Sequence, residues 1–390
     1  MAQSRPEAGK NAPHEGTCLL LGYRPDLFGE YPRHDAVGKL DQDGRAQAAV
    51  GPWHGDLIRK LPDDILGCIL SLVGYKYAVR ASATCRRWKD MHLQAPHVWL
   101  YTVSRGAGAT HSMERMLRRR RRVQRLRVVY GADVPAQREC MARLIELADA
   151  PALEVCAECT DKGLPEGGAG GAWSLEVPPS TAELTLWTSD FAIRLPTIHG
   201  AGVSSLKTFA LEARLTLRWD TLAGLGFPSL EDLSIADCTL AAGSGMAVSS
   251  AAMPRLKHLR VTNVTVDDAG RPGSITVDAD ELTTLHMSTP YPRAGHIVYS
   301  SVHLRTPKLR VLSCRVCWAC EVRVHSVGRL SSVAVELAYG EMPRIIPEKI
   351  RTITKEEAHG LMRSILAGLW PGLRHQGVAL KQLLGYVYYY

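Results

Sequence analysis

The sequence predicts an α+β chain in which a small helical unit is followed by a repeating α/β solenoid and a C-terminal capping helix. Residues 60–88 hold a dense run of apolar residues at helical spacing. From residue 206 onward a leucine-headed segment recurs six times, with leading positions 24, 26, 26, 27 and 21 residues apart. A repeat of that length indicates stacked supersecondary units. After residue 354 the apolar spacing predicts one last amphipathic helix.

Residues 1–55 mix Gly, Pro, His and charged residues without sustained periodicity, and we expect a disordered leader there. The first residues lack the apolar core of a secretory signal, and no run approaches the roughly 20 apolar residues that cross a bilayer. We therefore expect no membrane partner and a nuclear or cytoplasmic location, with the 10 cysteines reduced.

The helical unit begins at residue 61. Pro62 suits the first turn of a helix, where its missing N–H is no loss, and Asp63 and Asp64 complement the positive end of the helix dipole. The next apolar residues recur at spacings of three and four: Ile65, Leu66, Ile69, Leu70, Leu72 and Val73. One or two further helices and an apolar latch are expected over 77–100. Three short helices in about forty residues make a poor independent core, so this unit needs a neighbour.

Residues 56–100 resemble an F-box, and the prefix DLIRKLPDDIL resembles the plant subclass of that family. The matching letters are Leu61, Pro62, Ile65, Leu66, Ile69, Leu70, Cys85, Arg86, Arg87, Trp88, Val98 and Trp99. The sequence departs from the family's usual residues at Val73, Tyr77 and Thr84. The change at Tyr77 removes a carboxylate from a helix start and predicts weaker binding to the family's adaptor.

The resemblance implies docking on a Skp-type adaptor and, through it, on a cullin. By family analogy the adaptor-binding residues are Leu61, Pro62, Ile65, Leu66, Ile69 and Trp88. Packing inside the helical unit is the alternative role for Leu66 and Trp88.

The repeated segments, LKTFAL, LEDLSI, LKHLRV, LTTLHM, LRVLSC and LSSVAV, predict short strands of a solenoid over 123–347. They resemble leucine-rich repeats, most clearly over 200–340; VQRLRV and TAELTL fit earlier, while the register near Leu153 stays open. Because side chains alternate along a strand, Leu233 and Ile235 are expected to point inward and their neighbours outward. Stacked repeats bury a continuous core and leave an open surface for partners.

The outward positions of these strands form a mixed polar strip, which we predict to contact an unknown target protein. The candidate target-binding residues are Asp232, Ser234, His258, Arg260, Thr284, His286, Ser313 and Arg315.

Residues 101–122 are expected to be a basic linker. They contain much of the formal net charge of +8, including the run Arg118–Arg122. A solvated loop is the favoured interpretation and a nucleic-acid contact the alternative, against which stands the lack of interleaved aromatic residues.

Beyond the repeats, residues 348–390 are expected to cap the solenoid and end in a tail with no assigned role. Residues 354–357 have the spacing of a capping box. The residues that follow on one helical face are Leu361, Met362, Ile365, Leu366 and Leu369.

Cysteine pairs at CxxC spacing, such as Cys314 and Cys317, raise the possibility of zinc. Residues three apart on a strand point to opposite faces, so buried core thiols are the favoured interpretation, with no metal and no cofactor. The sequence also lacks the common hydrolase, metalloprotease and phosphate-loop motifs.

The two resemblances together imply a non-catalytic substrate receptor of an SCF-type ubiquitin ligase. The alternatives are a leucine-rich-repeat interaction protein that recruits no ligase, and a nucleic-acid binder that uses Arg118–Arg122.

Overall fold

The computed structural model describes the chain over sixteen segments: 60–72, 74–83, 87–88, 91–102, 107–120, 122–131, 134–158, 173–188, 195–214, 216–241, 245–266, 273–288, 299–315, 319–339, 355–373 and 384–389. The chain divides into two units, Met1–Lys60 and Leu61–Tyr390, and of the first only Lys60 is described. The expected leader over 1–55 lies outside the described residues, as do Val73, Thr84, Cys85 and Arg86.

The helical unit has two α-helices and a short 3₁₀ helix among its described residues: α2 (Asp63–Leu72), α3 (Gly74–Ser82) and η1 (Met91–Leu93). Their inward side chains form a small core of their own, separate from the main core of the molecule: Leu66, Leu70, Ala78 and Met91. Helix α2 begins where the sequence predicts, with the Leu66 amide donating to the Pro62 carbonyl at 3.1 Å. No helix in the described part of the chain is long and apolar enough to span a bilayer.

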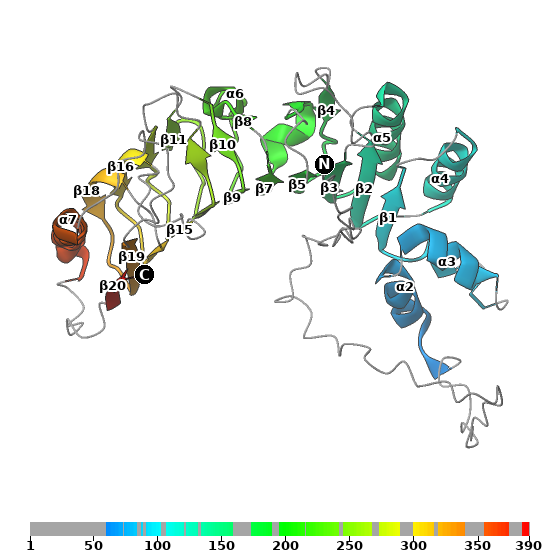
Figure 1. Cartoon of the computed structure of the whole chain (residues 1–390). Helices are drawn as coiled ribbons and strands as arrows, with labels where there is room; N and C mark the ends of the chain where they lie inside the picture. The colour runs from blue at the N-terminus through cyan, green and yellow to red at the C-terminus, as the bar shows by residue number, and fades with distance from the viewer. Residues whose placement is uncertain are drawn as a thin grey trace, which may run out of the picture. The chain divides into compact units, whose positions relative to one another are not determined.

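One long parallel sheet dominates the rest of the chain (Figure 1). Its eleven strands follow one another in chain order. They are β1 (His97–Tyr101), β2 (Arg125–Gly131), β3 (Ala152–Glu158), β5 (Glu183–Thr188), β7 (Thr208–Ala213), β9 (Asp232–Ala236), β12 (His258–Thr262), β15 (Thr284–Ser288), β17 (Val311–Arg315), β19 (Ser332–Tyr339) and β20 (Leu384–Tyr389). The sheet is open over the described strands, with β1 and β20 at its edges.

The six repeated segments supply β7, β9, β12, β15, β17 and β19, and their strands pair in the register that the repeat predicts. Phe209, Leu233, Leu259, Leu285 and Leu312 lie side by side in one ladder. The leading leucine of every copy is fully buried: Leu206, Leu230, Leu256, Leu282, Leu309 and Leu330. The same ladder continues back through Leu184, Leu153 and Leu126, which settles the register near Leu153.

The region between the helical unit and the first repeat differs from the expected linker. Strand β1 pairs with β2, so residues 97–101 belong to the long sheet as well as contacting α2 and α3. Helix α4 (Ala107–Arg119) then occupies most of the stretch predicted as a basic linker. Its Met113, Met116 and Leu117 are buried in the main core, because the apolar residues of this stretch recur at helical spacing between the arginines.

A second layer covers the inner face of the long sheet. Helices α4 and α5 (Pro135–Ala148) pack there first. Further along lie η2 (Ala201–Ser205), α6 (Trp219–Ala223), a two-stranded sheet of β4 (Ser174–Glu176) and β6 (Thr197–His199), and a three-stranded sheet of β8 (Thr216–Leu217), β10 (Thr239–Leu240) and β13 (Thr265–Val266). A four-stranded sheet follows: β11 (Met246–Ser249), β14 (Ser274–Asp278), β16 (Tyr299–Thr306) and β18 (Ala319–Val327).

The last helix, α7 (Lys355–Leu373), packs on β18 and β19. The apolar face that the sequence predicts is buried: Leu361, Met362, Ile365 and Leu369. Residues 384–389 of the tail form strand β20, which pairs with β19. Thr354 of the expected capping box lies outside the described residues.

The turns that follow β9 and β12 each contain one residue in the left-handed backbone conformation. Asp237 and Asn263 have φ angles of 56° and 51°. The Asn263 side-chain amide donates to Asp237 Oδ1 at 2.6 Å, so the turns of successive repeats are linked. Asn and Asp are the non-glycine residues that adopt this conformation most readily.

Candidate functional site

Helix α2 presents two apolar faces, and among the described residues only one of them packs in a core. Leu66 and Leu70 are buried, with 1% and 2% of their surface exposed. Ile65, Ile69 and Leu72 recur at i, i+4 and i+7 on the other face and are 43%, 39% and 56% exposed. Three large aliphatic side chains on one exposed stripe form a surface that another protein can cover.

Helix α3 packs on α2 and adds two more exposed apolar side chains, Tyr77 and Val79. Tyr77, which replaces the acid usual at this position in the family that the sequence resembles, is 59% exposed. Tyr77 and Val79 lie two residues apart on α3 and point to different sides of it, so the apolar docking face is defined as the α2 stripe, Ile65, Ile69 and Leu72.

A charged contact fixes the start of α2. The Arg87 guanidinium donates to Asp63 Oδ1 through Nη2 at 2.7 Å and through Nε at 3.0 Å, and also to the Leu61 carbonyl. Asp63 therefore binds a specific partner as well as complementing the helix dipole. The contact ties the chain near Trp88 to the segment that precedes α2.

The six residues predicted to bind the adaptor fall into an exposed group and a group that packs in or against the small core. Pro62, Ile65 and Ile69 are exposed. Leu66 lies in the small core, and Leu61 and Trp88 pack against it while partly buried. The exposed three are positioned to contact a partner directly, and packing accounts for Leu66. Leu72 and Val79 were not among the predicted residues, although Leu72 continues the helical spacing of Ile65 and Ile69.

One arginine of the basic run connects the helical unit to the second layer. Arg120 donates to the Ala95 carbonyl at 2.5 Å, on the connection between η1 and β1, and to the His92 carbonyl in η1. The side chains of Arg118, Arg119 and Arg122 are exposed. Arg120 thus has a structural role that a solvated linker does not provide.

The residues predicted to bind a target lie on the outer face of the long sheet, opposite the main core. Asp232, His258 and Thr284 pair in register, and Ser234, Arg260, His286 and Ser313 form the next row. The burial of β9 alternates as predicted, with Leu233 and Ile235 buried between partly exposed neighbours. His258 Nε2 lies 4.0 Å from Asp232 Oδ1. The side chain of Arg315 lies outside the described residues.

The same face carries aromatic residues near β1 that were not predicted from the sequence as partner contacts. Trp99 and Tyr101 are 40% and 42% exposed. Arg127 stacks over Trp99, with its guanidinium carbon 4.6 Å from the ring centroid. Trp187 on β5 packs over the buried Val129 and Cys156, which lie on this outer side. The alternation in HVWLY and ELTLWT was the signal that could have placed these aromatic residues outward.

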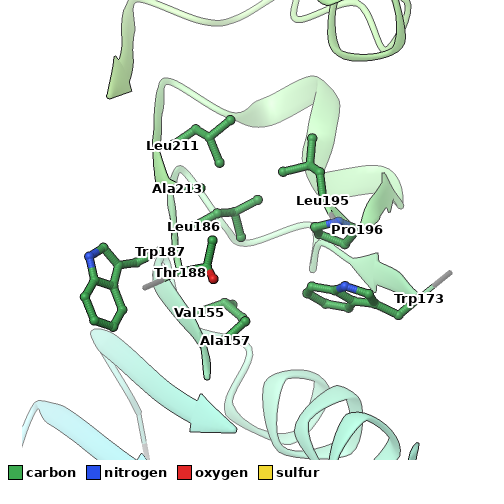
Figure 2. A pocket seen from close by; sticks show the side chains of 10 residues that line it. All are labelled: Val155, Ala157, Trp173, Leu186, Trp187, Thr188, Leu195, Pro196, Leu211 and Ala213. Atoms are coloured by element: carbon green, nitrogen blue, oxygen red, sulfur yellow. The ribbon is translucent and has the colours of Figure 1, made fainter. Parts of the chain in front are cut away.

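A small apolar pocket lies on the inner side of β5 and β7 (Figure 2). Figure 2 shows Trp173, Leu195 and Pro196 on the side of β5 opposite the Trp187 ring. The pocket holds about 20 Å³, which is room for roughly one water molecule. A drug-sized ligand needs a pocket of about 300 Å³ or more, so in this conformation the pocket has no room for one.

Buried thiols lie in the sheet rather than in a reactive site. Burial raises the pKa of Cys238 to about 12 and raises that of Cys156 as well. Both thiols are therefore protonated at neutral pH, the form that neither attacks nor binds metal. Across the described segments, no three His, Cys, Asp or Glu side chains cluster in a way that could hold a metal ion.

Comparison with known protein families gives a match over the helical unit. Residues 58–91 match the family model of the F-box domain. No curated protein and no solved structure matches the chain. F-box domains in general bind Skp-type adaptors in SCF complexes, and the proteins that carry them are typically non-catalytic substrate receptors. The match coincides with α2, α3 and the docking face, and the chain therefore contains an F-box domain at residues 58–91.

Proposed function

We propose that this protein is the substrate-recognition subunit of an SCF-type ubiquitin ligase. Its F-box docks on a Skp-type adaptor and so on a cullin, and its long sheet binds the target protein. The observation that carries the proposal is the docking face, which leaves apolar side chains of α2 exposed inside a domain that matches the F-box model. The chain itself is not an enzyme in this proposal, and ubiquitin transfer takes place on other subunits.

The long sheet supports the target-binding half of the proposal. Its repeated strands align the leading leucines in the core and leave the alternate residues outward, as the leucine-rich-repeat resemblance implies. We therefore propose a leucine-rich-repeat solenoid over 123–347, preceded by β1 and α4. The target contacts the outer row that contains Ser234, Arg260 and His286. The same proposal places the chain in the nucleus or cytoplasm.

The direct test removes the exposed face and spares the core. In Ile65→Ala/Ile69→Ala each substitution takes away a side chain that is roughly half exposed in the free chain. Covering each by the adaptor is worth about 1 kcal/mol, so the double variant is expected to weaken adaptor binding about 30-fold. Binding to a purified Skp-type adaptor is measured by calorimetry, with far-UV circular dichroism as the folding check.

Trp370→Ala is the matched control, because Trp370 is an apolar side chain on α7 that is 46% exposed. It is expected to leave adaptor binding unchanged. Leu61→Ala is a poorer probe, since Leu61 packs on the small core and its loss disturbs folding as well as docking. Equal affinity of the wild type and the double variant would overturn the docking assignment. A wild-type chain that binds no adaptor would leave the second candidate, a recognition protein that recruits no ligase, which the exposed Tyr77 favours.

A further inference from the structure

The outer face of the long sheet has an apolar end near its first strands. Trp99, Tyr101 and Trp187 all point to this side, and Trp and Tyr are the residues that most often dominate binding energy at protein interfaces. The charges at this end are matched within the chain. Arg127 lies 3.2 Å from Glu154, and Arg125 lies 3.0 Å from Glu183. The Tyr101 hydroxyl donates to Glu158 Oε2 at 3.2 Å. This end therefore offers a partner an aromatic surface whose two arginines are already paired.

The middle of the same face offers a cation that no described carboxylate pairs with. Arg260 on β12 is exposed, and over the described part of the chain no carboxylate forms an ion pair with it. In its row it lies between Ser234 and His286, neither of which is acidic. The nearby carboxylate of Asp232 lies beside His258. An arginine presents a planar fork of N–H donors that fits a carboxylate in a bidentate pair.

Between these two ends lie the partly buried Glu212, which pairs in register with Trp187, and a run of small side chains. Ala210 on β7 and Ser234 and Ala236 on β9 lie on the outer face between Trp187 and Arg260. Because short side chains rise little above a sheet, the backbone of another chain can approach closely along this path. From β5 to β12 is three strand spacings, or about 14 Å, and Arg260 lies about 7 Å further back along the strand direction. The two anchors are thus about 16 Å apart, the length of roughly five residues of extended chain.

We propose that this face binds an extended acidic segment of the target protein, whose apolar side chain packs on Trp187 and whose Asp or Glu, about five residues away, pairs with Arg260. The proposal rests on the target-binding role of the sheet and names the chemistry of the target. It places the principal contacts closer to β1 than the polar strip alone indicates.

The test selects ligands without assuming a target. A phage library of random 12-residue peptides is panned against the full-length chain, and the most enriched peptide is synthesised and its affinity measured by fluorescence anisotropy. Enriched sequences are expected to carry a large apolar residue and an acid four to six positions apart. Arg260→Glu and Trp187→Ala are each expected to lower the affinity about tenfold or more. Replacing the peptide's acid by lysine is expected to restore binding to Arg260→Glu.

Arg218→Glu is the matched control for charge. Arg218 is exposed and precedes α6, which packs on β11 of the four-stranded sheet, and this change is expected to leave peptide affinity unchanged. Enrichment of neutral or basic peptides, absence of enrichment, or unchanged affinity of Arg260→Glu would overturn the proposal. So would displacement of the peptide by a single-stranded oligonucleotide, which would assign the face to nucleic acid. Adaptor binding is measured on the same preparations: a chain that selects acidic peptides but binds no adaptor contradicts the ligase role and leaves this inference standing.

Discussion

Two glycines of helix α7 give a direct test of how that helix packs on β18. A Cβ added at Gly368 would lie 2.7 Å from the Cβ of Val324 and 3.1 Å from its Cγ2, while a Cβ at Gly360 would meet nothing within 4 Å. Either Gly→Ala change gains about 1 kcal/mol of helix propensity. At Gly368 the new methyl overpacks against a stiff β-branched residue, at a cost of about 1–3 kcal/mol. We expect Gly360→Ala to stabilise the helix by about 1 kcal/mol and Gly368→Ala to destabilise it by up to about 2 kcal/mol.

Amide hydrogen exchange followed by mass spectrometry measures the stability of α7 and β18 separately from the rest of the chain. A local measurement is needed because repeat arrays need not unfold in one step. Peptides from α7 and β18 should exchange more slowly in Gly360→Ala and faster in Gly368→Ala, with peptides from α2 unchanged in both. If the two variants protect α7 equally, the helix does not lie against Val324 through Gly368. Stabilisation of α7 in Gly368→Ala would refute the packing argument outright.

Four further predictions concern the core, the thiols and a turn. Leu66→Ala should cost about 2–5 kcal/mol of unfolding free energy and Ile65→Ala well under 1 kcal/mol, measured by urea unfolding; equal costs would contradict the two-faced helix. Iodoacetamide at neutral pH should label the exposed Cys68 in the native chain and the buried Cys238 only after denaturation. Folding raises the pKa of Cys238 from 9.0 to about 12, so the contribution of this thiol to the free energy of unfolding is complete below pH 9 and is lost as the pH rises toward 12. In Cys238→Ala the urea midpoint should therefore fall less steeply between pH 9 and pH 12 than in the wild type. Asn263→Val should cost about 1–2 kcal/mol more than Asn263→Gly, since only glycine keeps the left-handed turn without strain; equal midpoints would contradict this.

The strands of the long sheet could be predicted where one face of the strand is buried and the other is exposed. A strand with one face in the core and one in solvent shows its alternation in the sequence, so the residue pattern alone assigns Leu233 and Ile235 inward. The leading leucines were visible for the same reason, because each repeat places the same side chain at the same depth. The leucine-rich-repeat and plant-type resemblances remain predictions.

Other strands escaped prediction because their sequences lack that signature. The four-stranded sheet uses segments such as SITVD and YSSVHLRT, which carry no leading leucine and vary in spacing. Strand β1 lies in a stretch that resembles the end of an F-box, and only its pairing with β2 reveals a sheet edge. Arg120 was counted among solvated charges, because sequence cannot show that the carbonyls of His92 and Ala95 lie within its reach.

The sequence could predict that the candidate site lies on an amphipathic helix, but not which apolar residues of that helix pack inside and which stay exposed. Sequence treats Ile65 and Leu66 alike, as apolar residues near the start of an amphipathic helix. The decision between packing and docking is made by tertiary contacts with Ala78 and Met91, which lie on other elements and cover Leu66 but not Ile65. Arg260 was identified as outward by its position in the repeat. That no carboxylate of the described residues pairs with it follows only from how the charges of neighbouring strands pair.

The small core of the F-box domain predicts that the two proposed activities, adaptor docking and target recognition, can be separated by mutation. Its buried side chains form a cluster that is distinct from the core beneath the long sheet. The described connections between the two include contacts of α2 and α3 with β1, the packing of Leu93 of η1 on the main core and the hydrogen bonds of Arg120. A change on the exposed stripe of α2 alters neither core, so it should act on adaptor binding alone. A change at Arg260 lies on the far side of the sheet from its core and should act on target binding alone. A single variant on the α2 stripe that abolished both activities would show that the F-box and the sheet are coupled more tightly than these contacts allow.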